Sequence, residues 1–244
     1  MRLYGGGSPA PISYSRVTPI DASTVVNWKL TETAAPYANS GTAGTLNLTS
    51  GGANAPIPGI VGTVDKCVYC NNASTRYLTT AATSTGEVTG SVITVSLWVN
   101  LSQHTAWGGI LQKCMYLASN TDASSILFQQ TDVSGAWSQN LPTSTLAYGW
   151  TFTEPENLLV YGKWSMLGVT YDGSTMKYFK DGRMIRSRAA TGTIDYGTHG
   201  AWRIMQRADG VVSTGYIEDV RVESVARSES YMMDMYKRGV GFLV

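Results

Sequence analysis

Alternation of apolar and polar residues is the main structural signal along this chain. In residues 92–99, VITVSLWV, apolar side chains occupy every second position from Ile93 to Val99, with Thr94, Ser96 and Trp98 between them. This alternation predicts a strand with one face in a core. Residues 164–171, WSMLGVTY, are apolar on both faces, as expected of a central strand in a sandwich.

Two Asp-Gly dipeptides mark tight turns after these segments. Asp172-Gly173 precedes residues 176–180, and Asp181-Gly182 follows them. Aspartate and glycine both tolerate positive φ angles, so each dipeptide predicts a hairpin and the two together predict a β-meander. A further strand is predicted over residues 215–223.

One helix is predicted near the C-terminal end of the chain. Ser228 is a suitable N-cap, and Gly239 is expected to end the helix. An apolar stripe with helical spacing is formed by Met232, Met235 and Tyr236. The remaining pattern is dominated by strands, which predicts an all-β fold.

Residues 1–20 differ from the rest of the chain. They contain three glycines and three prolines among small polar residues and show no sustained period. We therefore expect an extended N-terminal docking arm over residues 1–20, followed by one domain over residues 21–244.

Composition excludes several classes of protein. Charged residues make up 14% of the chain and the net charge is +1, while 24 serines and 28 threonines supply polarity. A neutral chain without a cluster of basic residues is not expected to bind nucleic acid or a membrane surface. The three cysteines, Cys67, Cys70 and Cys114, form neither a disulfide framework nor a complete zinc motif, so we expect small buried side chains.

The order of several short motifs resembles the laminin-G-like branch of the concanavalin A-like jelly rolls. The resemblance covers roughly residues 24–239. The motifs that carry it lie at residues 26–30, 38–41, 76–79, 94–99, 109–113, 163–174, 178–182 and 215–222, followed by 226–228 and the helix. It implies two antiparallel sheets packed face to face as a β-sandwich, here with a short C-terminal helix and the N-terminal arm.

Some glucanases with this fold use carboxylates that alternate along one strand. The nearest match here is Glu218, Asp219 and Glu223. In a regular strand Glu218 would share a face with Val220 and Val222. These acids are either a reactive pair or ion-pair partners beneath the helix, and we expect the second. The prediction is that the protein is not an enzyme.

The resemblance also raises the question of calcium, because some laminin-G-like domains bind Ca²⁺ through loop carboxylates and carbonyls. The loop acids to consider are Asp122 and Asp132. The chain contains no DxDxDG loop, and single loop aspartates commonly form turns. We therefore expect no cofactor, with Asp122 and Asp132 as the weak calcium candidates.

Four tryptophans lie in or beside predicted loops: Trp107, Trp137, Trp150 and Trp202. Half-exposed indoles serve as sugar platforms and as anchors in protein interfaces, and some cap a core. All three roles remain open at this stage. If the protein is adhesive, His104 and Asn140 are the candidate polar partners of these aromatic groups.

Laminin-G-like domains look similar to decoration, fibre and tail proteins of bacteriophages. The sequence shows no secretion signal and no disulfide framework, its surface is neutral, and an arm precedes the domain. We therefore predict a structural or adhesive virion protein, assembled in the host cytoplasm. The arm would bind other virion proteins, the chain would form a homo-oligomer, with a trimer favoured, and cell-surface glycans are the candidate ligands. The alternative is a secreted or surface carbohydrate-binding module of a bacterium, with an extracellular location.

Overall fold

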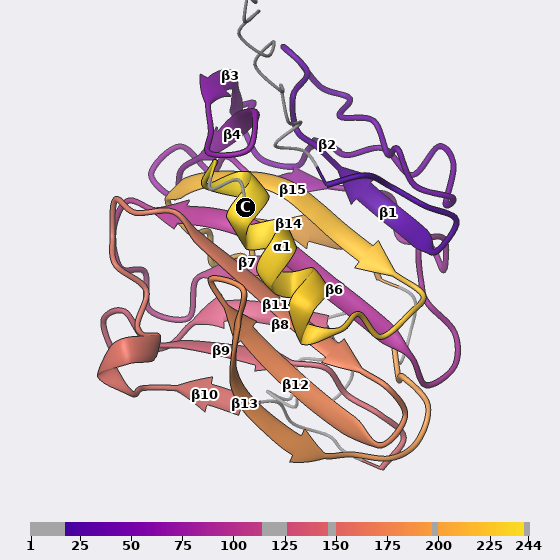
Figure 1. Ribbon diagram of the computed structural model, residues 1–244. Helices are drawn as coiled ribbons and strands as arrows, with labels where there is room; N and C mark the ends of the chain where they lie inside the picture. The colour runs from indigo at the N-terminus through magenta and orange to yellow at the C-terminus, as the bar shows by residue number, and fades with distance from the viewer. Residues whose placement is uncertain (1–17, 114–125, 146–149, 197–199, 242–244) are drawn as a thin grey trace, which may run out of the picture.

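The computed structural model describes residues 18–113, 126–145, 150–196 and 200–241, and these form two antiparallel β-sheets packed face to face (Figure 1). The described residues also include an α-helix, which lies across the outer face of the larger sheet. The predicted all-β sandwich with a short C-terminal helix is therefore confirmed.

The larger sheet has eight strands. Seven follow the order β13-β12-β11-β6-β15-β4-β3, and β1 pairs with β15. Their bounds are β1 Thr24–Trp28, β3 Ile57–Val61, β4 Lys66–Cys70, β6 Ile93–Leu101, β11 Ser165–Tyr171, β12 Thr175–Lys180, β13 Arg183–Ala189 and β15 Gly215–Glu223. The predicted strands at residues 164–171 and 215–223 are thus present, and both are central.

The smaller sheet has seven strands in the order β10-β9-β8-β7-β14-β5-β2. Their bounds are β2 Thr49–Ser50, β5 Leu78–Thr79, β7 Gly109–Lys113, β8 Ile126–Gln130, β9 Trp137–Asn140, β10 Trp150–Phe152 and β14 Trp202–Ile204. A single turn of 3₁₀-helix, η1 (Pro155–Asn157), follows β10.

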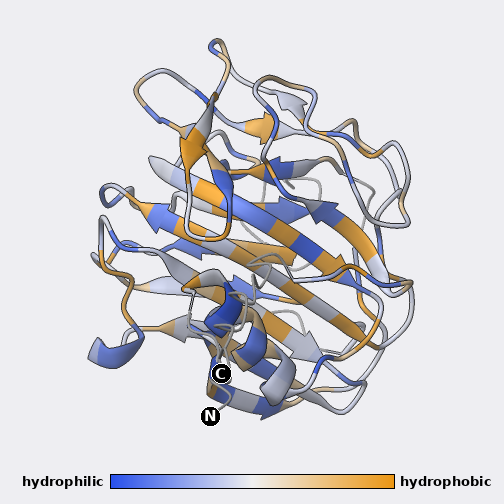
Figure 2. Cartoon of the chain, turned by 45° about the horizontal axis from the view of Figure 1, so that its top comes forward, coloured by the Kyte–Doolittle hydropathy of each residue, from blue (hydrophilic) through white to orange (hydrophobic). Residues whose placement is uncertain are grey.

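The core lies between the two sheets and follows the alternation in the sequence. Ile93, Val95, Leu97 and Val99 of β6 all point into it and are buried. Figure 2 shows the same alternation of hydrophobic and hydrophilic positions along the strands. Each such side chain contributes about 1.5–3 kcal/mol on full burial, so the alternation fixes which face of β6 points inward.

A second apolar layer lies beneath the helix α1 (Glu229–Gly239). Met232 and Met235 pack there against Trp98, which is on the outer face of β6. The Ser228 hydroxyl accepts a hydrogen bond from the Tyr231 N–H at 3.2 Å, which confirms the predicted N-cap.

The helix ends at Gly239, as predicted. Gly239 is the last residue of α1, and a Cβ atom there would approach the Trp98 ring to 2.2 Å, so glycine is required for close packing. The left-handed residue after the helix is Gly241, with a φ of 74°.

The Asp-Gly turns form the two predicted hairpins by different means. Asp181 and Gly182 both have positive φ, 52° and 75°. In the other turn only Gly173 has positive φ, and the Asp172 carboxylate instead accepts a hydrogen bond from the Ser174 N–H at 2.9 Å.

Strand β15 contains a bulge at Asp219, which has a φ of 45°. The pairing with β6 shifts between Glu218 and Arg221, so Ile217 and Val220 both point into the core. The predicted shared face of Glu218 and Val220 is therefore wrong, because the extra residue reverses the alternation and leaves Glu218 on the outer face.

Thr18 and Pro19, near the end of the predicted arm, contact the domain. Thr18 is buried, and the Arg221 guanidinium donates hydrogen bonds to the carbonyl oxygens of Thr18 and Pro19. Residues 1–17 lie outside the described part of the chain. The folded part of the chain therefore includes at least Thr18 and Pro19, although the prediction assigned them to the arm.

Candidate functional site

One end of the sandwich is formed by the loop between β6 and β7, which carries Trp107. The Trp107 side chain is 42% exposed, and its backbone has a φ of 60°. The left-handed region costs an ordinary residue about 1–2 kcal/mol, because its Cβ crowds the carbonyl oxygen. Surrounding contacts must therefore hold this indole in place.

The loop is held by hydrogen bonds to the end of β8. The Trp107 N–H donates to the Thr131 carbonyl at 3.3 Å, and a His104 ring nitrogen lies 3.0 Å from the same oxygen. The Thr105 N–H donates to the Gln130 side-chain oxygen at 3.1 Å. A Cβ atom on Gly108 would lie 2.5 Å from the Ser213 hydroxyl, so the loop is also closely packed. Trp107 is thus presented on a well-fixed loop.

Two further segments adjoin this loop and also carry exposed apolar side chains. Val133 is exposed in the loop between β8 and β9, and Val160 is exposed in residues 158–163. These two segments are joined by a hydrogen bond of 2.8 Å from the Leu159 N–H to the Gly135 carbonyl. We call residues 102–108, 131–136 and 158–163 the Trp107 rim. It combines an indole with His104 and Asp132.

Trp150 and Asn140 lie at the other end of β8 and β9. Asn140 pairs with Leu127 at the start of β8, whereas the rim follows the end of β8. Trp150 is partly buried, and the Arg186 guanidinium covers its ring at 3.9 Å from the centroid. The predicted set of contact residues is therefore divided between two ends of the molecule.

Trp137 and Trp202 are core residues, so their predicted place on a loop rim is wrong. Both are fully buried. The Trp137 ring stacks on Phe152 at 4.4 Å, and the Trp202 ring meets Trp28 edge-on at 5.7 Å. Trp137 begins β9 and Trp202 begins β14, and the inward side chains of both strands face the other sheet. Both residues therefore have the core role, one of the three roles that the sequence left open.

Two of the three carboxylates of β15 form ion pairs. Asp219 accepts hydrogen bonds from Arg221 at 3.0 Å and from the Asn27 side chain at 2.8 Å. Glu223 pairs with Arg227 at 2.7 Å. For these two residues the ion-pair interpretation is confirmed.

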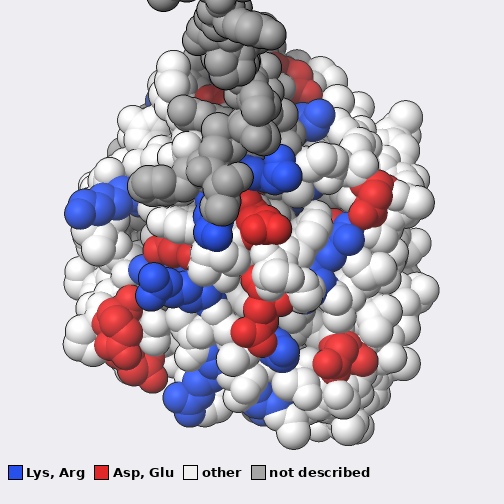
Figure 3. All heavy atoms as spheres, viewed as in Figure 1, with Lys and Arg blue, Asp and Glu red and all other residues white. Residues whose placement is uncertain are grey.

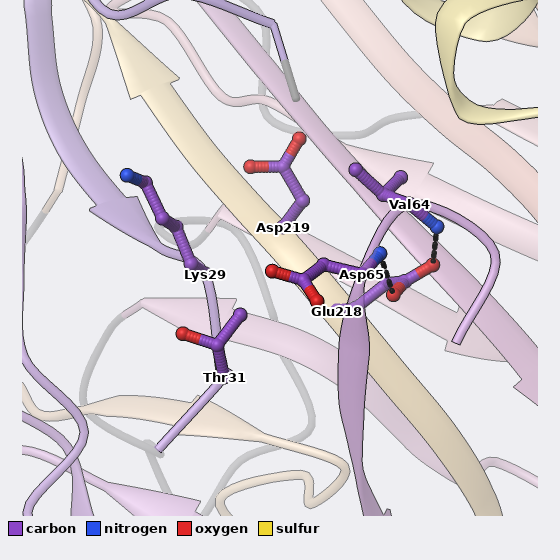
Figure 4. Close-up of a pocket in the computed structure, with 6 residues that line it drawn as sticks. All are labelled: Lys29, Thr31, Val64, Asp65, Glu218 and Asp219. Atoms are coloured by element: carbon purple, nitrogen blue, oxygen red, sulfur yellow. Dashed lines mark hydrogen bonds between the residues drawn. The ribbon is translucent and has the colours of Figure 1, made fainter. Parts of the chain in front are cut away.

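Glu218 has a different environment. Its side chain is about 1% exposed, and one oxygen accepts hydrogen bonds from the Thr63 and Val64 N–H groups at 2.7 and 2.8 Å. Figure 4 shows this carboxylate beside a cavity that Lys29 and Asp65 also line. Burial raises the pKa of Glu218 to about 7, against the opposing effect of the N–H donors.

The cavity beside Glu218 measures about 10 Å³, the space of about one water molecule. It is too small to admit a sugar ring. Glu218 instead fastens the turn between β3 and β4 to β15, and the Thr63 hydroxyl of the same turn donates to the Gly239 carbonyl of α1 at 3.2 Å. Its role in the described structure is to join these elements.

The described residues do not assemble a carboxylate cage around Asp132. In that part of the chain, no three histidine, cysteine, aspartate or glutamate side chains lie together as metal ligands would. Asp132 is exposed, and the other calcium candidate, Asp122, lies outside the described residues.

The cysteines of β4 are buried thiols. Cys67 and Cys70 are free and fully buried, as predicted, and burial raises the pKa of Cys67 to about 12. Cys114 lies outside the described residues. Neither described thiol is poised to react, because the thiolate is strongly disfavoured.

In the part of the chain that the structure describes, no helix has the length and apolar character needed to cross a membrane.

Solved structures share this fold at low sequence identity. Domain 4 of AbnA, a GH43 extracellular arabinanase from Geobacillus stearothermophilus solved in complex with arabinotriose, matches with a TM-score of 0.63 and 15% identity, covering 89% of this chain and 100% of that domain. The binding domain of Paraclostridial Mosquitocidal Protein 1 has a TM-score of 0.63 and 11% identity. The receptor binding domain of botulinum neurotoxin D has a TM-score of 0.63 and 12% identity.

This chain spans about half of each toxin domain: 88% of it matches 52% of the mosquitocidal chain and 52% of the neurotoxin chain. At these identities the likeness shows the fold alone. No curated protein matches the chain in sequence. A laminin G-type family model described as the concanavalin A-like lectin/glucanases superfamily matches residues 72–231, more than half of the chain. With the two-sheet architecture described above, this match places the chain in the concanavalin A-like lectin/glucanase superfamily.

Proposed function

We propose that this protein is a non-catalytic carbohydrate-binding module whose contact surface is the Trp107 rim. The observation that carries the proposal is the exposed indole of Trp107, held at a φ of 60° by hydrogen bonds to β8. Strained backbone at an exposed aromatic residue is a reason to expect function there, because packing alone gains nothing from it.

The chemistry of the rim suits a sugar. An indole face stacks on the C–H face of a pyranose or furanose ring, while His104 and Asp132 supply hydrogen-bonding groups for hydroxyls. The neighbouring elements hold the rim rigidly, and its loops can vary in chemistry without disturbing the core.

The fold neighbours support a binding role. One of them is an arabinanase domain in complex with arabinotriose, and the others are binding domains of toxins. Arabinotriose is therefore the first ligand to test. Stacking on a single ring buries little area, so we expect weak binding by one module and useful avidity only from several copies.

The test compares two tryptophans with different surroundings. Wild type, Trp107→Ala and Trp150→Ala would be screened on a glycan array, and any ligand, with arabinotriose, would be titrated by calorimetry. We expect Trp107→Ala to abolish binding and Trp150→Ala to retain it. Wild-type affinity in Trp107→Ala, or no glycan bound by the wild type, would refute the proposal.

The position of the rim also supports a finer proposal about how the module is mounted. Thr24 of β1 pairs with Glu223 at one end of β15, whereas Gly215 at the other end pairs with Leu101, just before the rim loop. Thr24, which follows the arm, thus lies at the end of β15 opposite the rim. We propose a virion component docked through the N-terminal arm to other virion proteins, with the rim directed outward.

The mounting proposal has its own experiment. Antibody against the chain would be used to probe density-gradient fractions of phage particles and the culture medium of the source cells. We expect the protein in the particle fractions, and light scattering should find a homo-oligomer, with a trimer expected. Protein in the medium and not in particles would favour the alternative, a secreted bacterial carbohydrate-binding module.

A further inference from the structure

A second concave surface lies on the face that carries α1, at the edge strand β13. It is bounded by η1, the turn between β12 and β13, and α1, and its volume is about 500 Å³. Sites for small ligands commonly measure about 300–1,000 Å³. Figure 3 looks onto this face and shows basic and acidic side chains close together on it.

The groove is held open by close packing of the turn against the helix. A Cβ atom on Gly182 would lie 2.8 Å from the Tyr236 Cβ and 2.9 Å from the Met233 Cα, so the turn admits no side chain there. The Tyr236 ring stacks on Trp98 with centroids 5.7 Å apart. The Asp181 carboxylate accepts a hydrogen bond from the Met166 N–H at 3.0 Å. The turn and the helix, which form two sides of the groove, are therefore held in place before any ligand binds.

The charges of the groove are only partly matched within the protein. Lys180 and Asp181 form an ion pair at 3.1 Å. Arg183 and Glu156 also line the groove, and neither forms an ion pair with any residue that the structure describes. The groove thus offers a guanidinium fork and a carboxylate to a ligand, with the exposed Met184 as an apolar surface beside them.

These groups can bind a ligand with one anionic group and several hydroxyls. A guanidinium binds a carboxylate through two parallel hydrogen bonds. A carboxylate such as that of Glu156 accepts hydrogen bonds from hydroxyls but repels a second anion nearby. A chain of closely spaced acids, such as an acidic peptide, is therefore a poorer fit than a sugar with a single carboxylate.

We propose that this groove binds a uronic acid unit of an anionic saccharide, with Arg183 pairing with the sugar carboxylate and Glu156 accepting hydrogen bonds from its hydroxyls. The groove shares no lining residue with the Trp107 rim, although η1 directly precedes residues 158–163 of the rim. It requires no ligand at the rim.

The first test is titration of the full chain with trigalacturonate and with the neutral galactotriose. We expect only the acidic trisaccharide to bind in the groove. Arg183→Gln should lower the affinity for trigalacturonate by about tenfold or more, because a hydrogen bond to a charged group is lost. The matched control is Arg186→Gln on the same strand, whose guanidinium covers Trp150 and does not line the groove. Equal binding by Arg183→Gln and wild type would overturn the proposal.

A second variant separates specific recognition from simple charge attraction. Glu156→Ala removes a negative charge, so nonspecific attraction predicts tighter binding of trigalacturonate, whereas loss of a hydroxyl acceptor predicts weaker binding. We expect weaker binding. Tighter binding of hexaglutamate than of trigalacturonate would assign the groove to an acidic peptide and refute a sugar site. Trp107→Ala should leave trigalacturonate binding unchanged. Loss of binding in that variant would place the ligand at the rim and refute the groove as its site.

Discussion

Replacing Glu218 with glutamine should stabilise the protein above neutral pH and change its stability little in acid. The carboxylate is buried on the outer face of β15 and lies beside Asp219 and Asp65, with Lys29 also lining the cavity. Burial disfavours its charged form, and the nearby Asp219 adds to this effect, so the pKa rises from 4.5 to about 7.

The sign and size follow from proton linkage. Because the folded protein holds the proton of Glu218 more tightly than the unfolded chain does, the contribution of this group is fully present below pH 4.5 and is lost as the pH rises to about 7. The difference between these two pKa values corresponds to about 3 kcal/mol. Glutamine keeps a carbonyl oxygen for the Thr63 and Val64 N–H groups and carries no charge. The free energy of unfolding of Glu218→Gln at pH 8 should therefore exceed that of wild type by about 2–3 kcal/mol. This figure allows for a small loss at the third, longer hydrogen bond, which the Asp65 N–H donates to the other oxygen of Glu218.

The assay is urea unfolding of wild type and Glu218→Gln at a series of pH values from 4.5 to 8. The control is Glu229→Gln, because Glu229 is exposed and its ion pair with Lys177 contributes at most about 1 kcal/mol. We expect the difference in unfolding free energy between wild type and Glu218→Gln to grow with pH. A difference that is constant across the series would refute the reasoning, as would a Glu218→Gln protein that is less stable than wild type at pH 8.

Three further predictions concern stability. Trp137→Ala should cost about 3–5 kcal/mol in urea unfolding, because it opens a cavity in the core. Gly239→Ala should lower stability by about 1–3 kcal/mol despite the better helix propensity of alanine, since the new methyl group would meet the Trp98 ring; an unchanged urea midpoint would contradict the packing. Deletion of residues 1–17 should leave the thermal midpoint unchanged, whereas deletion of residues 1–20 should lower it. The longer deletion removes the two carbonyl groups that accept hydrogen bonds from the buried Arg221 of β15. Equal midpoints for the two deletions would contradict this prediction.

The fold could be predicted well where a local pattern decides the structure. The alternation around Val95 and the Asp181-Gly182 turn each specify a conformation through their own residues, and the structure agrees. The bulge at Asp219 could not be predicted in this way. Its φ of 45° depends on β15 changing partners from β4 to β1, which is a property of the sheet and not of the segment.

The candidate site was harder to predict, because exposure is a tertiary property. Trp107 and Trp137 both lie beside turn-forming residues, yet one is exposed and the other is fully buried. Position at the start of a strand was the only signal for Trp137, and the boundary of β9 was not evident from its sequence. The groove beside α1 had no local signal, because Glu156, Arg183 and Tyr236 come from three separate parts of the chain.

The central place of β15 has a consequence for the order of folding. This strand pairs with β6 on one side and with β4 and β1 on the other, although β1 precedes it by about two hundred residues. Without β15 the larger sheet would be left as separate pieces with unpaired edges. Folding of such nonlocal sheets is slow, on the order of milliseconds to seconds. During synthesis the nascent chain therefore stays incomplete, with exposed strand edges, until Glu223 has left the ribosome, and this is the interval in which a chaperone would be needed.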